Sequence, residues 1–179
     1  MPALLTVFIA ALVPMIMGFI WYNPKVFGTA WMQASGLTPE TAMKGFNMPL
    51  VMGISLFMSF LLAFSLNPIV IHQFGFFSMM VTPDGQKELA DHASSTYGHA
   101  KALFDEFGGS FRSFKHGMLH GAILAIFTIM PVLVTGSLFE RKGFKYIAIN
   151  AGYWIVCLTI MGGIICQFMP HTGVFPVNL

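Results

Sequence analysis

Residues 116–139, HGMLHGAILAIFTIMPVLVTGSLF, contain no aspartate, glutamate, lysine or arginine. A helix of about 20 apolar residues is long enough to cross the hydrocarbon core of a bilayer. Three other stretches are equally free of charge, and the four together hold 121 of the 179 residues: 1–24, 45–83, 116–139 and 146–179. The pattern predicts an all-α integral membrane protein, a four-helix bundle with spans at about 2–22, 49–71, 116–139 and 146–169.

The composition supports this class and argues against others. Hydrophobic residues make up 56% of the chain and charged residues 9%, whereas soluble domains average about 25% charged residues. We therefore expect one transmembrane domain over residues 1–179, with the lipid bilayer as its first partner. The net charge of +2 is too small to predict nucleic-acid binding. The chain has no nucleophile elbow, P-loop or dinucleotide fingerprint, so we predict no enzymatic activity and no cofactor.

The long second loop, residues 73–115, contains a further predicted helix. Thr82-Pro83-Asp84 is a strong helix start and Gly108-Gly109 a strong stop. Between them apolar residues recur at helical spacing, which predicts one amphipathic helix over 82–108, outside the membrane: Leu89, Ala93, Tyr97, Ala100, Phe104 and Phe107.

Small residues recur four positions apart on three of the predicted spans. Such residues let helix backbones approach closely in lipid, where apolar burial does not drive association. We therefore predict that these positions pack the helices together: Ser55, Ser59 and Ala63 on the second span, Gly117, Gly121 and Ala125 on the third, and Ala148 and Gly152 on the fourth.

The basic residues of the loops predict the orientation. Loops on the side opposite the termini hold five of them, Lys25, Lys44, Arg141, Lys142 and Lys145. Short loops rich in lysine and arginine face the cytoplasm. We therefore predict a multi-pass protein of a bacterial inner membrane, with both termini and the 73–115 loop outside.

All six histidines fall on this predicted outer side. His116 and His120 are four residues apart, so they share a helix face. With His92 and His99 of the loop helix they form a candidate metal site, because imidazoles are common ligands of Zn²⁺. The alternative is a solvated face of histidines that binds nothing.

Two segments resemble a known family. They are GFIWYNPKVFGTAW at 18–31, followed by SGLT at 35–38, and LFERKGFKYIAINAGY at 138–153, followed by MGG at 161–163. Together they resemble a family of small bacterial integral membrane proteins of unknown function, with about four spans. The 73–115 loop departs from that pattern. The resemblance implies a fold and a membrane location, and it implies no activity or substrate.

These observations predict three alternative functions. The first is a non-enzymatic accessory or structural subunit of a membrane complex, or a homo-oligomer, because the spans are uncharged and carry small residues at helical spacing. The second is a small transporter or channel, for which Asn67, Asn150 and Gln167 are the polar candidates. Proton-coupled transporters usually place charged residues within the membrane, and the spans contain none. The third is a membrane protein that binds metal through the outer histidines.

Overall fold

The computed structural model describes residues 1–42, 45, 47–80 and 82–170, and within them all regular secondary structure is helical. Lys44 and His171 lie outside the described residues. Four helices are long and apolar enough to cross a membrane, at Ala3–Trp21, Met48–Val70, Phe114–Phe139 and Phe144–Phe168. Each begins and ends within two residues of the bounds that the sequence predicts, which confirms the all-α fold class.

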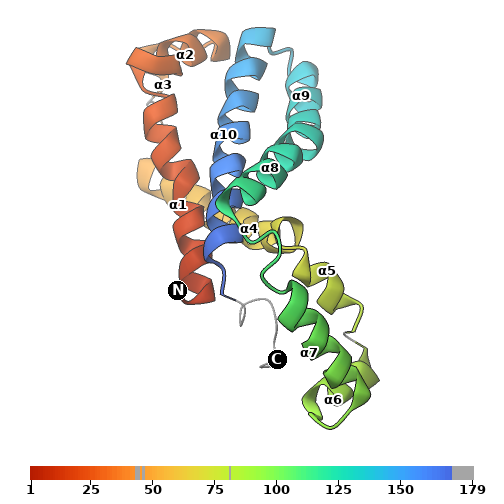
Figure 1. The fold of residues 1–179 in the computed structure, drawn as a ribbon. Helices are drawn as coiled ribbons and strands as arrows, with labels where there is room; N and C mark the ends of the chain where they lie inside the picture. The colour runs from red at the N-terminus through yellow and green to blue at the C-terminus, as the bar shows by residue number, and fades with distance from the viewer. Residues whose placement is uncertain (43–44, 46, 81, 171–179) are drawn as a thin grey trace.

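The helices follow one another in a simple order (Figure 1). In chain order they are α1 (Ala3–Trp21), a π-helical turn η1 (Pro24–Gly28), α2 (Thr29–Ser35), α3 (Pro39–Ala42), α4 (Met48–Val70), α5 (Gln73–Ser78), α6 (Pro83–Ala90), α7 (Ser95–Phe107), α8 (Phe114–Leu124), a π-helical turn η2 (Ala125–Ile129), α9 (Met130–Phe139) and α10 (Phe144–Phe168). Pro131, the second residue of α9, has no N–H group to donate to the preceding turn. That preceding turn is the π-helical η2, which lies directly before α9.

Helix α10 lies at the centre of the molecule. It contacts α1, α4 and α8, and its buried side chains include Cys157, Leu158, Met161 and Ile165, each 0% exposed. Figure 1 shows α1 on one side of α10 and α8–α9 on the other, with α4 crossing both α1 and α10 obliquely. The core of the fold is therefore built around the last span.

The long loop forms an arm of three helices, α5, α6 and α7, which extends away from the bundle (Figure 1). The prediction of one helix over 82–108 was wrong, because α6 ends at Ala90 and α7 begins at Ser95. The Asp91 carboxylate accepts a hydrogen bond from the N–H of Ala93 at 3.0 Å, and the Ser94 hydroxyl accepts one from the N–H of Tyr97 at 3.0 Å. These local side-chain bonds compete with the helical pattern and start a new helix.

Candidate metal centre

Three histidines meet where the end of α4 approaches the start of α8. His72 lies two residues after the end of α4, and His116 and His120 lie one turn apart on α8. Their ligand nitrogens all lie within 4.8 Å of one another, and the Nε2 atoms of His72 and His116 are 2.9 Å apart. Within the described part of the chain, this is the group of histidine, cysteine and carboxylate side chains whose geometry could hold a metal ion.

The start of α8 is fixed against α10 by hydrogen bonds and by glycines. The Ser113 hydroxyl accepts from the N–H of His116 at 3.3 Å, and the Gln167 side-chain oxygen accepts from the N–H of Phe114 at 3.0 Å. A Cβ atom on Gly117 would lie 2.2 Å from the carbonyl oxygen of Gly162, so the two backbones are in direct contact. His116 therefore projects from a helix end that cannot shift freely.

His72 is held from the other side by the last turn of α4. Leu66, Val70 and Ile71 are at most 1% exposed, and the N–H of Ile71 donates to the carbonyl oxygen of Asn67 at 3.1 Å. Functional side chains on rigid elements keep their geometry better than those on loops. The cluster thus joins two anchored helix ends.

The ring of Phe111 borders the cluster. Its centroid lies 6.0 Å from that of His72 and 5.1 Å from that of His116. Phe111 has a positive φ of 60°, a left-handed conformation that costs a non-glycine residue about 1–2 kcal/mol. Packing in the surrounding structure must offset this cost. Phe111 therefore forms one wall of the candidate site.

The spacing of the three histidines suits tetrahedral coordination. Zn–N bonds of about 2.0–2.1 Å place the nitrogens of a tetrahedral site about 3.3 Å apart. The Nε2 atoms of His72 and His116, in hydrogen-bond contact at 2.9 Å, are close to this spacing, and all three nitrogens lie within 4.8 Å of one another. No cysteine or carboxylate belongs to the group. Three imidazoles leave one position of a tetrahedral ion open, which is typical of zinc sites that bind water or an exogenous ligand.

The two segments that carry the family resemblance lie against each other, although they are more than 100 residues apart. The indole N–H of Trp21 donates to the carbonyl oxygen of Ile149 at 3.1 Å. The hydroxyl of Tyr22 donates to the Asn150 side-chain oxygen at 2.8 Å. A family model described as "Protein of unknown function (DUF1761)" matches residues 5–166. The chain belongs to this family. The match extends over the region of the 73–115 loop as well as over both segments.

Neither of the other two comparisons with known proteins gives a match. No curated protein and no solved structure is significantly similar to this DUF1761 protein. The family description supplies no activity and assigns no chemistry to the site.

The structure divides the four histidines predicted as ligands. His116 and His120 of the DUF1761 chain are in the cluster, whereas His92 and His99 are not among its members. The His92 ring stacks on Tyr97 with a centroid distance of 4.3 Å, and His99 is exposed on α7. His72, the third member of the cluster, was not among the predicted ligands. Its place at the end of one span, facing the start of the next, was the available signal.

The predicted packing residues lie in different surroundings. Ser59, Ala63 and Ala125 are buried, and Ser55 is half-buried. A Cβ atom on Gly121 would lie 2.1 Å from the carbonyl oxygen of Leu158, and one on Gly152 would lie 3.1 Å from the ring of Trp21. Ala148 is exposed, beside a cavity between α9 and α10.

The polar candidates for a transport path form hydrogen bonds within the protein. The Asn67 amide N–H donates to the carbonyl oxygens of Ala63 and Phe64 on its own helix, at 3.2 and 2.9 Å. Asn150 accepts from Tyr22, and Gln167 accepts from the N–H of Phe114. These bonds connect or stabilise helices, and they give no support to a path for a transported solute.

Proposed function

We propose that this protein is a multi-pass integral membrane protein that binds a divalent transition-metal ion through His72, His116 and His120. The convergence of the three ring nitrogens within 4.8 Å carries the proposal. Imidazole suits Zn²⁺, Cu²⁺ and Ni²⁺, whereas Mg²⁺ and Ca²⁺ prefer oxygen ligands. The four long apolar helices support the location in a membrane.

The site lies at the end of the bundle that also holds the start of α1. The Thr6 hydroxyl donates to the carbonyl oxygen of Phe168 at 3.2 Å, which joins the beginning of α1 to the end of α10. The start of α8 joins the same region through Gln167. A membrane normal along α10 would place the metal near one boundary between lipid and water, within reach of ions from solution.

Metal binding can be measured with Co²⁺, whose visible absorption distinguishes tetrahedral from octahedral coordination. The full-length protein should carry no polyhistidine tag, because such a tag binds the same ions. We expect one Co²⁺ per chain with the intense absorption of a tetrahedral site. Loss of a supporting residue alone costs about 10–100-fold in metal affinity. We therefore expect His72→Ala or His116→Ala, each of which removes a ligand, to weaken binding by at least about 100-fold.

The chain provides matched controls for this experiment. His92→Ala and His99→Ala remove histidines from the same region that are outside the cluster, and they should leave the Co²⁺ affinity unchanged. If they weaken binding as much as His72→Ala does, or if the cluster variants bind normally, the proposal is wrong.

A second candidate role is the accessory subunit or homo-oligomer that the sequence predicts. The observation that favours it is the outer surface of α4, where six large apolar side chains are exposed: Leu50, Ile54, Phe57, Met58, Leu61 and Phe64. A second copy of the chain or another membrane protein would cover these side chains in place of lipid. Native mass spectrometry in a mild detergent tests this role, and a strict monomer in every condition argues against self-association.

The proposed location is a bacterial inner membrane, with both termini and the 73–115 arm outside. The proposal rests on the basic residues of the opposite loops. A cysteine introduced at Ser95, which is exposed on α7, should react with a membrane-impermeant maleimide in intact spheroplasts. Reaction only after the membrane is broken would reverse the orientation.

A further inference from the structure

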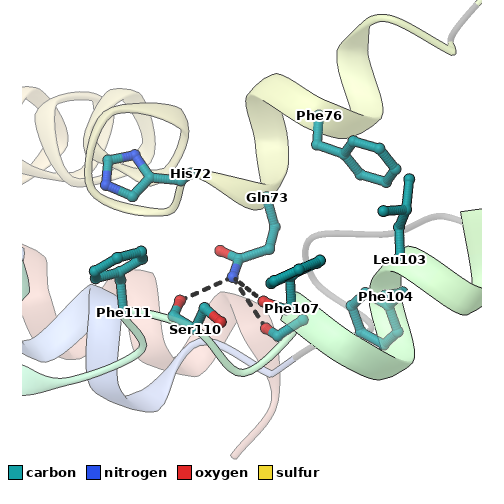
Figure 2. A pocket seen from close by; sticks show the side chains of 9 residues that line it. His72, Gln73, Phe76, Leu103, Phe104, Phe107, Ser110 and Phe111 are labelled. Carbon is teal, nitrogen blue, oxygen red and sulfur yellow. Dashed lines mark hydrogen bonds between the residues drawn. The ribbon is translucent and has the colours of Figure 1, made fainter.

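A cavity of about 270 Å³ lies beside the three-histidine cluster, between α5, α7 and the chain that leads to α8. Its apolar walls are Phe76, Leu103, Phe104, Phe107 and Phe111. Figure 2 shows Phe76 and Leu103 on one side of Gln73 and the rings of His72 and Phe111 on the other. A cavity of about 150 Å³ lined by apolar side chains is large enough for benzene. This cavity is therefore large enough for a bicyclic aromatic group.

The cavity is formed before any ligand arrives. The Gln73 side-chain N–H₂ donates to the carbonyl oxygens of Phe107, Gly108 and Ser110, at 3.2, 3.0 and 3.0 Å (Figure 2). These bonds tie the end of α7 to the start of α5. Because the walls are fixed, a ligand that enters does not have to order them, which lowers the cost of binding.

The cavity and the cluster share one side chain, His72, and the ring of Phe111 borders both. His72 is a member of the cluster and lines the cavity, and Phe111 lines the cavity next to the rings of His72 and His116. A metal ion held by the three imidazoles has an open position. A ligand whose head group fills that position can place an apolar body along Phe111 and into the cavity.

The charges around the site favour an anionic head group. A divalent ion held by three neutral imidazoles keeps its charge of +2, because the cluster contains no carboxylate. Of the described residues that line the cavity, none is acidic. Opposite charges attract more strongly near a surface of low dielectric constant than in bulk water.

We propose that the metal-loaded site binds an aromatic monocarboxylate, with the carboxylate on the metal ion and the ring system in the cavity. The inference rests on the proposed metal site. Binding replaces one metal-bound water with a carboxylate oxygen, and no electron is transferred. Leu103 and Phe107 contact the ring system, while His72, His116 and His120 hold the ion.

The test compares two carboxylates on the Co²⁺-loaded, full-length protein. Because the Co²⁺ absorption changes only when a ligand enters its coordination shell, partition of the probe into detergent gives no signal. We expect 2-naphthoate to bind at least about tenfold more tightly than acetate, because its rings leave water for the cavity. Leu103→Trp, which fills the cavity, should abolish this preference.

Leu61→Trp is the matched control. Leu61 is 47% exposed on α4 and Leu103 is 42% exposed on α7, so both substitutions add the same bulk to a similarly open position. Leu61→Trp should keep the preference for 2-naphthoate. Equal 2-naphthoate affinities in wild type, Leu103→Trp and Leu61→Trp, with Co²⁺ bound normally, would overturn this inference alone. Failure of the wild type to bind Co²⁺ would overturn the metal site itself.

Discussion

Gly121→Ala is the substitution whose effect can be worked out most directly from the structure. The added Cβ atom would lie 2.1 Å from the carbonyl oxygen of Leu158 and 2.8 Å from its carbonyl carbon. Ordinary contacts of a Cβ atom begin at 3.4 Å, so the two helices must separate by roughly 1.3 Å. The obstacle is the backbone of α10, which cannot rotate away as a side chain can.

The cost follows from this separation. Overpacking of a well-packed core costs about 1–3 kcal/mol, and occasionally more. Separation of α8 from α10 also loosens the contact between Gly117 and Gly162, which lies one turn away. We therefore expect Gly121→Ala to lower the free energy of unfolding by about 2–3 kcal/mol. The same movement displaces His116 and His120 from His72, so the Co²⁺ affinity should fall in parallel.

Gly136→Ala is the matched control, because Gly136 lies on the same candidate span and a Cβ atom there meets nothing within 4 Å. Alanine is favoured over glycine in a helix by up to about 1 kcal/mol, so this variant should be as stable as wild type or slightly more stable. The assay is reversible unfolding in detergent, followed by the loss of helical circular dichroism. Equal stabilities of Gly121→Ala and Gly136→Ala would refute the reasoning.

Three further predictions concern the rest of the fold. Tyr153→Phe removes the 2.7 Å hydrogen bond from the Tyr153 hydroxyl to the carbonyl oxygen of Pro14. This loss should lower the free energy of unfolding by about 1 kcal/mol, and an unchanged unfolding midpoint would contradict the role of this bond. Gln73→Leu removes the side-chain donor of three carbonyl groups, of which that of Phe107 still accepts from the N–H of Ser110. The tie between α5 and the end of α7 is lost, so hydrogen–deuterium exchange should accelerate in α7 and stay unchanged in α10. Cys157 and Cys166 are both 0% exposed, so a maleimide should label them only after denaturation, and labelling of the folded protein would show that α10 is not central.

Much of the fold could be predicted because the absence of charge is a strong signal. Each long helix needs about 20 apolar residues to span a bilayer. Charged residues occur only between the four uncharged stretches, so they delimit the predicted spans. The glycines of the third span were also informative, since Gly117 and Gly121 do lie where α8 and α10 touch. Periodicity alone could not show which helix takes the centre, because α10 is no more apolar than the others.

The predicted site was incomplete for two physical reasons. The first is that the apolar spacing over 82–108 predicts one helix, which places His92 and His99 on a common face. The side-chain hydrogen bonds of Asp91 and Ser94 interrupt that helix. The spacing of the apolar residues continues across the break, so this spacing alone does not reveal the break. The second is that His72 reaches His116 across 44 positions of sequence, a distance that no local pattern encodes. The pair at 116 and 120 was found because four residues make one helical turn.

X-ray absorption at the zinc edge tests the central claim most directly, because it counts the imidazoles around the ion. The sample is the untagged, full-length protein loaded with one Zn²⁺ per chain. We predict three imidazole nitrogens at about 2.0–2.1 Å and one exchangeable ligand that is not an imidazole, with two imidazoles in His72→Ala and three in His92→Ala. A shell of oxygen atoms alone, or a loss of an imidazole in His92→Ala and not in His72→Ala, would contradict the three-histidine site.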